Sequence, residues 1–593
     1  MGFSTTLGPN GWQPVDTQNR DYAAAVVGAG IDANRGAPGK LFRKHSAVLF
    51  DITRDHTAAG YGIFATSCTH SIANERGRWS AYSRKITITG AAAEFKCRST
   101  GVGAPLNIFI DPVQRALQFS IYFDANPTEF AAPSNPYLTI YISNFWSGGA
   151  NQGRWTIDSG YLRQGWNLIT IRANDVVGAS AGLGDMPAGM TRNSDLGTGF
   201  DWNASLEYVN FAFTNFDVGA VMHIDMIRAP AEAVPVFVIG FDAVGAFGND
   251  DVLYAKVAPL FAKWGIKSYA TFTHVYDLLY AGGSGWARFA KLQSQYGWDA
   301  IPHSWNHGGT ALGANLTLSS LVAALDVVTA TYTSAHLIPL GRKFRARISG
   351  ASISAANGVF EMTATAANQV QYTATGAGSA TATGTIRINT FMSEVFSTDT
   401  AENRRLVSQE WTRNAQAMRA TGFARGVPYI AYPNNSVPHL DVMAAVAAEA
   451  GIRLGRASRG GYAFLDEIGL DNALNFGSWI MDNGVTLATK TSYIKAKAQG
   501  AIDRGVHCHI FGHFILDDED PTNAAYRPVD PDSPPGVNGN PAPPGGASQT
   551  GGGWWYLSQL RRLIEDTVGP AVQSGAALAM SPSEYDWYFG GWR

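Results

Sequence analysis

Two histidines four residues apart form the chemical pattern that says most about this 593-residue chain. His303 and His307 can point their imidazoles the same way from one helical turn. Neutral imidazoles at this spacing can coordinate one divalent metal ion together. Asp242, which follows the apolar run ending at Phe241, would then supply a base beside that metal. The pair can also be two ordinary, partly buried histidines, so neighbouring motifs must decide between the two interpretations.

Composition excludes several classes of protein. The chain is 46% apolar and 15% charged, so it can build large cores. Its formal net charge is -3 and its sequence has no basic run, so no basic surface for binding nucleic-acid phosphates is expected. Nucleic acid is therefore not an expected partner. The N-terminus carries no basic and apolar leader, and no apolar run is long enough to span a bilayer, so neither a cleaved signal peptide nor a membrane anchor is expected. Three cysteines do not make a disulfide scaffold.

The pattern along the chain predicts a multidomain protein. Residues 1–45 are rich in Gly, Asn and Ala and indicate an arm or attachment segment. Residues 46–232 show many short strands between turn residues, which is typical of an all-β sandwich or jelly roll. Residues 233–339 and 396–593 alternate strands and helices, and the sequence predicts an α/β barrel there. Residues 340–395, rich in Ala, Thr, Gly and Ser, are expected to form a small inserted β module.

Particular stretches carry these expectations. In the β-rich region the expected strands are 80–88, 106–110, 117–123, 137–143, 166–172, 209–214 and 221–227. In the α/β region, strands are expected at 236–241, 268–272, 428–432 and 505–511, and helices at 253–264, 401–421, 440–449 and 554–568. The acidic and Pro/Gly-rich segment 516–553 cannot build a core of its own and is expected to be a long loop.

Five ordered blocks resemble the polysaccharide deacetylase family of carbohydrate esterases. They run in the family's order and cover the two α/β segments. The blocks are Ile239-Gly240-Phe241-Asp242, Trp264-Gly265-Ile266-Lys267, Gly297-Trp298-Asp299 with His303-Ser304-Trp305-Asn306-His307, Ala431-Tyr432-Pro433-Asn434-Asn435, and Gly512-His513. The resemblance implies metal-dependent hydrolysis of an acetyl group, with a (β/α) barrel as the scaffold.

The resemblance also implies a role for each matching residue. His303 and His307 would be the metal ligands, with zinc the expected divalent ion. Asp242 would be the catalytic base, and His513 would protonate the departing amine. Tyr432 would help to hold the oxyanion through its backbone amide. Further residues expected to contact the substrate are Pro433, Asn434 and Trp305.

The chain departs from the family at two places. Where the family has a second aspartate that joins the histidines on the metal, this chain has Ala243. Asp250 and Asp251 could substitute as metal ligands, or they could simply cap the helix that begins near Val252. The family's orienting arginine is also missing from its usual block. Arg456 is a possible replacement, and its alternative is a structural arginine at the end of the sheet.

The flanking regions carry weaker resemblances. The β-rich region, with Gly165-Trp166-Asn167 and His223-Ile224-Asp225, is similar to jelly-roll, galactose-binding-like modules. Four of its tryptophans could stack on sugars or form the core. These are Trp146, Trp155, Trp166 and Trp202. The inserted module resembles β modules of bacteriophage structural proteins.

These resemblances imply a virion location, as a tail fibre or spike. The N-terminal arm would then dock on other tail proteins, and a homotrimer is a possible assembly. Two functions stay open. One is a virion-borne deacetylase acting on bacterial surface polysaccharide, and the other is a receptor-binding or structural virion protein that keeps the fold with weakened or lost turnover.

Overall fold

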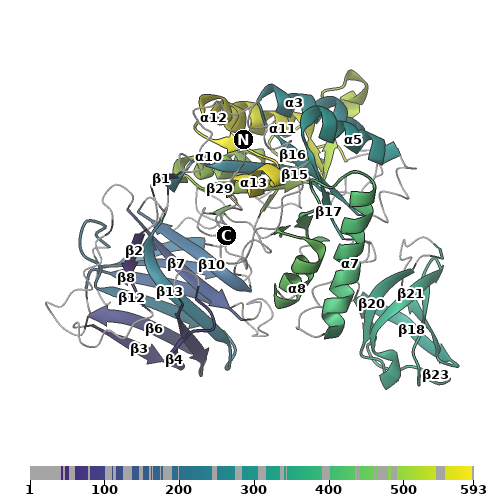
Figure 1. Cartoon of the computed structure of the whole chain (residues 1–593), viewed down its shortest axis with the longest axis horizontal. Coiled ribbons are helices and arrows are strands. Elements are labelled where there is room, and N and C mark those ends of the chain that lie inside the picture. Colours follow the sequence, from purple (N-terminus) through teal and green to yellow (C-terminus); the bar gives the residue numbers. More distant parts are fainter. Residues whose placement is uncertain are drawn as a thin grey trace, which may run out of the picture.

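The computed structural model describes most of residues 42–589 (Figure 1). Its longer gaps are 53–60, 100–109, 125–135, 178–189, 243–249, 274–283, 305–315, 390–400, 464–477, 482–489 and 543–553. Residues 106–109 of the expected strand at 106–110, and the arm up to residue 41, lie outside the described residues. In the described part of the chain, no helix is both long and apolar enough to cross a membrane.

Two six-stranded antiparallel sheets form a jelly-roll-like sandwich in the first part of the chain. The first sheet has the order β10-β7-β13-β5-β4, with β2 also paired to β13. Its strands are β2 (Ala47–Phe50), β4 (Cys68–Ala73), β5 (Ser83–Ile88), β7 (Ala116–Phe123), β10 (Gly165–Arg172) and β13 (Val221–Ala229). The second sheet has the order β11-β9-β8-β12-β6-β3. Its strands are β3 (Tyr61–Thr66), β6 (Ala92–Ser99), β8 (Tyr137–Ser143), β9 (Gln152–Asp158), β11 (Met190–Leu196) and β12 (Tyr208–Thr214).

Alternation along these strands explains why the two sheets face each other. On β12, Val209, Phe211 and Phe213 are fully buried and belong to one cluster shared by both sheets. Successive side chains of a strand point to opposite faces, so the residues between them lie on the outer face of the sandwich. Short β1 (Phe42–Lys44) and β14 (Glu232–Ala233) pair with each other where the sandwich begins and ends.

A mostly parallel seven-stranded sheet organises the α/β region. Its main order is β17-β16-β15-β29-β27, with β28 paired to β29 and β32 paired to β15. Only β27 runs antiparallel to its neighbour among the described pairings of this sheet. The strands are β15 (Val236–Phe241), β16 (Ser268–Phe272), β17 (Asp299–Pro302), β27 (Tyr462–Ala463), β28 (Trp479–Ile480), β29 (His507–Gly512) and β32 (Leu578–Ala579).

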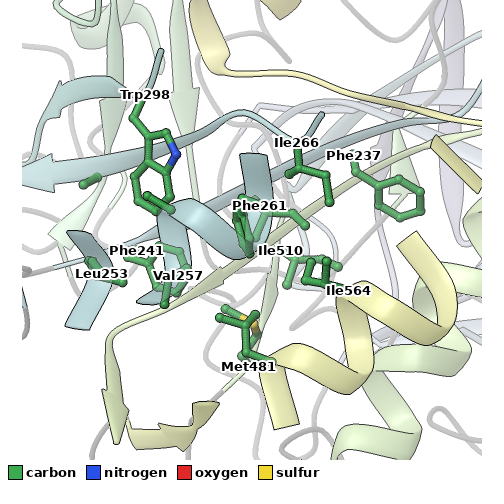
Figure 2. Close-up of a cluster of buried hydrophobic side chains, with 14 of the residues drawn as sticks. Phe237, Phe241, Leu253, Val257, Phe261, Ile266, Trp298, Met481, Ile510 and Ile564 are labelled. Atoms are coloured by element: carbon green, nitrogen blue, oxygen red, sulfur yellow. The ribbon is translucent and has the colours of Figure 1, made fainter. Parts of the chain in front are cut away.

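Helices flank this sheet and close its core. The first is one continuous helical run with a π-helical middle, formed by α2 (Asp250–Val252), η7 (Leu253–Val257) and α3 (Ala258–Lys263). The others are α5 (Ser284–Tyr296), α7 (Ala401–Ala420), α8 (Leu440–Ala450), α10 (Thr491–Arg504), α11 (Leu557–Leu563), η15 (Ile564–Val568), α12 (Gly569–Ser574) and α13 (Pro582–Phe589). Figure 2 shows side chains of strand and helix meeting in the core. There Trp298 stacks on Phe241, the residue before Asp242, with ring centroids 5.8 Å apart.

The predicted α/β barrel is wrong. A barrel requires the strands to close into one ring, whereas β25 (Tyr429–Ala431) and β26 (Leu454–Arg456) form a separate two-stranded parallel sheet. No described ladder joins that pair to β17 or to the other end of the seven-stranded sheet. The chain as a whole is dominated by antiparallel strand pairing, with the α/β region built on an open sheet. Strand–helix alternation predicts parallel pairing but does not determine whether a sheet closes.

The inserted module is where a closed sheet occurs. Its sheet order is β19-β22-β21-β20-β24-β18-β23, and an additional pairing of β19 with β18 closes the ring. The strands are β18 (Leu316–Ala324), β19 (Val327–Tyr332), β20 (Lys343–Ser349), β21 (Gly358–Ala366), β22 (Gln369–Thr373), β23 (Ala380–Thr381) and β24 (Arg387–Asn389). The ring includes β18 and β19, which precede residue 340, where the sequence places the start of this module. Figure 1 shows the module beside α7.

The acidic loop expected at 516–553 is held onto the helices as far as residue 542. After β30 (Phe514–Leu516), which pairs with β31 (Trp554–Tyr556), the chain makes the 3-10 helix η13 (Pro521–Tyr526). Asp532 accepts hydrogen bonds from the backbone and hydroxyl of Ser492 on α10. The carboxylate of Asp518 accepts equivalent bonds from Ser558 on α11. The segment is therefore ordered by contacts with neighbouring helices and by internal hydrogen bonds, such as those from Asn540 to the carbonyls of Asp530 and Ser533.

A buried ion pair joins the sandwich to the α/β region. Arg504, at the end of α10, donates to Asp175 at 2.6 Å, and both side chains are almost fully buried. The second carboxylate oxygen of Asp175 accepts from Trp155 Nε1 and from the backbone of Arg172. Arg172 in turn donates to the carbonyl of Arg504 at 3.1 Å. The first sheet of the sandwich thus lies against the α/β region.

Candidate active site

The carboxyl ends of the strands bring the predicted site residues to one edge. Asp242 follows β15, His303 follows β17 and His513 follows β29, three strands of the same parallel sheet. Parallel strands end at the same edge, where open α/β sheets bind their ligands. Tyr432 follows β25 and Arg456 ends β26 beside them.

Asp242 is held by a buried arginine. Its Oδ2 accepts from Arg456 Nη2 and its backbone N–H donates to the carbonyl of Gly512 at 2.8 Å. Burial on its own raises the pKa of Asp242, but the charge of Arg456, helped by His303 and His513, holds it below its ordinary value. Asp242 is therefore an ionised carboxylate at neutral pH. Its other oxygen, Oδ1, is buried without a hydrogen-bond partner among the described residues.

Arg456, the possible replacement for the family's orienting arginine, is the residue that contacts Asp242 in the structure. The guanidinium also lies over the ring of Phe511, 3.9 Å from its centroid. Arg425, the other arginine near this block, pairs instead with buried Asp299. Asp299 also accepts from the backbone and hydroxyl of Ser583, so it ties the 425 loop to the start of α13.

His303 is fixed in one tautomer. Its Nδ1 lies 2.7 Å from the carbonyl oxygen of Ala431. A carbonyl only accepts, so Nδ1 carries the proton and the lone pair of the neutral ring lies on Nε2. Burial lowers the pKa of His303 to about 4, despite the opposing effect of Asp242, so the ring is neutral at pH 7.

The backbone around His303 is secured from α7. Ser304 adopts a left-handed conformation with φ of 61°. Asn414 donates to the carbonyl of Ser304 at 2.7 Å and to that of Phe272 at 3.3 Å. Thr273 donates to the carbonyl of His303 at 3.2 Å. The sequence alone gave no signal for Asn414, because its role depends on where α7 packs.

Tyr269 is a second residue near the site that sequence reasoning missed. It lies on β16 beside β15, and a side-chain carbon at Gly240 would fall 2.1 Å from the ring of Tyr269. Its buried hydroxyl has no hydrogen-bond partner in the described part of the chain and interacts electrostatically with Asp242 and Arg456. Gly240 inside an apolar strand was the available signal, since such a glycine marks a close approach.

His513 and Tyr432 occupy the same edge with different exposure. His513 is half-buried, with Phe511 and Phe514 as ring neighbours. Tyr432 is buried, and its backbone N–H donates to the carbonyl of Arg456 at 2.9 Å. The expected donation from this N–H to an oxyanion would require that bond to break.

Several predicted site residues are not brought into this cluster by the described structure. Asp251 is exposed and pairs with Arg288 at 2.9 Å on α5. Asp250 begins α2, and Pro433 is buried after Tyr432. His307, Trp305, Asn434 and Ala243 lie outside the described residues.

The residues present fit a divalent metal in part. His303 offers a neutral imidazole nitrogen as a ligand. Asp242 Oδ1, a buried carboxylate oxygen that no described donor satisfies, would lie beside the ion as a base and not as a ligand. Among the described residues, no three His, Cys, Asp or Glu side chains gather in a way that could hold a metal. A metal site at this edge would need His307 as a further ligand.

The sandwich tryptophans that the structure describes are all buried. Trp155 is fully buried, while Trp166 and Trp202 are 4% and 6% exposed. Trp155 and Trp202 meet edge to face within the shared core cluster. These rings are therefore not available for stacking on a sugar, and Trp146 lies outside the described residues.

Comparisons with known proteins give only distant likenesses. No protein-family model matches the chain, and no curated protein matches it. A mutant of a family 29 carbohydrate-binding module is 12% identical and aligns over 31% of this chain and 90% of its own, with a TM-score of 0.17. The family 11 carbohydrate-binding module from Clostridium thermocellum, in complex with a β-1,3-1,4-mixed-linked tetrasaccharide, is 12% identical over 30% and 93%, with a TM-score of 0.18.

A third likeness is to the enzymatically active domain of tailspike protein 4 from bacteriophage CBA120. It is 12% identical over 29% of this chain and 20% of its own, with a TM-score of 0.17. Because these scores are far below 0.5, none of the three likenesses bears on the fold or the function of this chain.

Proposed function

We propose that the chain is a metal-dependent polysaccharide deacetylase that removes acetyl groups from bacterial surface glycans, carried on a phage particle as part of a tail fibre or spike. The observation that carries the proposal is the pairing of Asp242 with Arg456 beside His303 at the carboxyl edge of the parallel sheet. The virion setting rests on the resemblance of the inserted module to those of phage structural proteins.

The chain's own groups can move the protons that acetyl hydrolysis requires. Arg456 keeps Asp242 ionised and occupies Oδ2, which leaves Oδ1 to accept a proton from the attacking water. His513, half-buried at the neighbouring strand end, would give a proton to the departing amine as the carbon–nitrogen bond breaks. A divalent ion held by His303 and His307, with zinc the first expectation, would polarise the acetyl carbonyl.

Ala243 favours a second candidate. The family's metal-binding carboxylate is absent at this position, and exposed Asp251 is paired with Arg288 in the described structure. A chain without a third ligand would keep the fold as a receptor-binding or structural virion protein with weakened or lost turnover.

Metal content and acetate release separate the two candidates. Purified protein is analysed for bound metal by mass spectrometry and assayed for acetate release from acetylated chitooligosaccharide and from O-acetylated bacterial polysaccharide. The deacetylase predicts near-stoichiometric metal and release from at least one substrate, with both lost in His303→Ala. Absence of both metal and release, even after zinc is added, would establish the second candidate instead.

A further inference from the structure

The outer face of the second sandwich sheet carries an ordered row of polar and aromatic side chains. The strand registers place one residue from each strand directly opposite the next. In order from β11 to β3, the row is Asn193, Arg154, Tyr141, Asn210, Lys96 and Phe64. Five strand spacings of about 4.8 Å make it roughly 24 Å long.

Contacts within the sheet arrange this row in advance. Glu94 on β6 pairs with Lys96 at 2.5 Å and accepts from Asn210 Nδ2 at 3.1 Å. At the β3 edge, the guanidinium of Arg98 stacks on the ring of Phe64, 4.2 Å from its centroid. Groups fixed before a ligand arrives lose less freedom on binding.

Hydrogen bonds order the opposite end of the row as well. Asn193 donates to Thr156 at 2.7 Å, and Thr156 shares a hydrogen bond of 3.1 Å with Thr139. Arg154 donates from Nε and Nη2 to the carbonyl of Ser194. The polar side chains are therefore positioned across the whole width of the sheet.

Exposure and charge show that this face is a surface and not a second core. Lys96 and Glu94 have side chains 24% and 33% exposed, and Phe64 is 38% exposed. Tyr141 and Arg154 are half-buried. At the centre, Asn210 is 3% exposed, and its Oδ1 meets no donor within the part of the chain that the structure describes.

We propose that this face binds a segment of polysaccharide laid across the strands, at a glycan site separate from the catalytic edge. The rings of Tyr141 and Phe64 suit the apolar faces of sugar rings. Arg154, Asn193 and Lys96 supply donors for sugar hydroxyls.

The same composition disfavours other macromolecules. Two charged residues, Arg154 and Lys96, stand within the row, whereas the core of a protein interface is depleted of charge. The carboxylate of Glu94 beside Lys96 disfavours a nucleic-acid backbone.

The site would tether the chain while the catalytic edge works elsewhere on the glycan. The first sheet lies against the α/β region through Asp175 and Arg504, and the second sheet forms the other side of the sandwich. The choice of a surface glycan as ligand rests on the proposed function, but binding here needs no turnover. The Asp242→Asn variant, compared at a temperature at which it is fully folded, should therefore bind as tightly as the wild type.

A binding assay on the full chain tests the site. Wild type, Asp242→Asn and the double variant Tyr141→Ala/Arg154→Ala are measured against an immobilised panel of purified bacterial surface polysaccharides and against soluble chitohexaose. Wild type and Asp242→Asn should bind at least one probe equally. The double variant should bind it about tenfold or more weakly, because truncating central aromatic and arginine anchors has effects of this size.

Matched variants keep the test decisive. Tyr82→Ala/Arg115→Ala removes the same residue types from exposed positions elsewhere on the sandwich and should leave binding unchanged. If Tyr141→Ala/Arg154→Ala melts at a lower temperature than wild type, Arg154→Ala alone, at a half-buried position, takes its place. Failure of the wild type to bind any probe, or equal binding by the row variants, would overturn the site. Acetate release without such binding would leave the proposed function standing and remove this inference alone.

Discussion

Replacing Asp175 by Asn should destabilise the protein strongly, although the residue lies far from the catalytic edge. One carboxylate oxygen of Asp175 accepts a hydrogen bond from Arg504 Nη2 at 2.6 Å. The other accepts from Trp155 Nε1 at 2.9 Å and from the backbone N–H of Arg172 at 2.8 Å. All of these partners are donors. An amide has only one accepting oxygen, so in either orientation its NH₂ group faces a donor.

The magnitude follows from burial. The side chains of Arg504 and Asp175 are 2% and 0% exposed, so the substitution leaves an uncompensated cation out of contact with water. Breaking such a pair by removing one partner costs about 3–5 kcal/mol. Because the pair joins the sandwich to the α/β region, the loss should appear in the unfolding of both.

Urea unfolding followed by tryptophan fluorescence measures this loss. Asp566→Asn, which removes an exposed partner of Lys495, is the matched control and should cost roughly 0–1 kcal/mol. Asp175→Asn/Arg504→Met should recover most of the loss because the buried charge is gone. An effect of Asp175→Asn no larger than that of Asp566→Asn would refute the reasoning.

Three further substitutions test the interior of the α/β region by unfolding measurements. Gly240→Ala should cost about 1–3 kcal/mol, because the new carbon would fall 2.1 Å from the ring of Tyr269; equal stability would contradict the close approach. Arg456→Met should lower the free energy of unfolding by about 3–5 kcal/mol at pH 7, because it leaves the buried Asp242 carboxylate unpaired. The loss should be clearly smaller at pH 4, where that carboxyl can take up a proton. A loss of stability that does not depend on pH would contradict this pairing. Burial lowers the pKa of His507 from 6.5 to about 3, so its contribution to stability is present above pH about 6.5 and is lost as the pH falls towards 3. Between pH 7 and 5, the free energy of unfolding of the wild type should therefore fall by up to about 1.4 kcal/mol per pH unit more than that of His507→Gln. If the two free energies fell in parallel, this role of His507 would be excluded.

Local periodicity was sufficient to place the strands that build the site. The apolar run before Asp242 forms β15 (Val236–Phe241), and the run predicted at 268–272 forms β16 with the same bounds. Asp242, His303 and His513 each follow one strand of the same parallel sheet. They lie at one edge because parallel strands end together.

Closure and long-range partners were beyond the sequence. Whether a parallel sheet closes depends on pairings between distant strands, and β25 pairs with β26 apart from the main sheet. Whether Arg456 meets Asp242 or is only a structural arginine likewise depended on the register of β26, which places Arg456 opposite Ala431. The sandwich tryptophans could not be assigned to core or surface until the alternation of β9 and β10 was seen in three dimensions.

The central claim is that Asp242 is the base of an acetyl hydrolase, and acetate release by Asp242→Asn tests it most directly. Wild type and variant are assayed on the same acetylated glycan, with bound metal and thermal unfolding measured on the same samples. The account predicts that the wild type releases acetate and that the variant does not, while metal content stays largely unchanged. Release by the variant at the wild-type rate, or no release by a wild type that holds its metal, would contradict it.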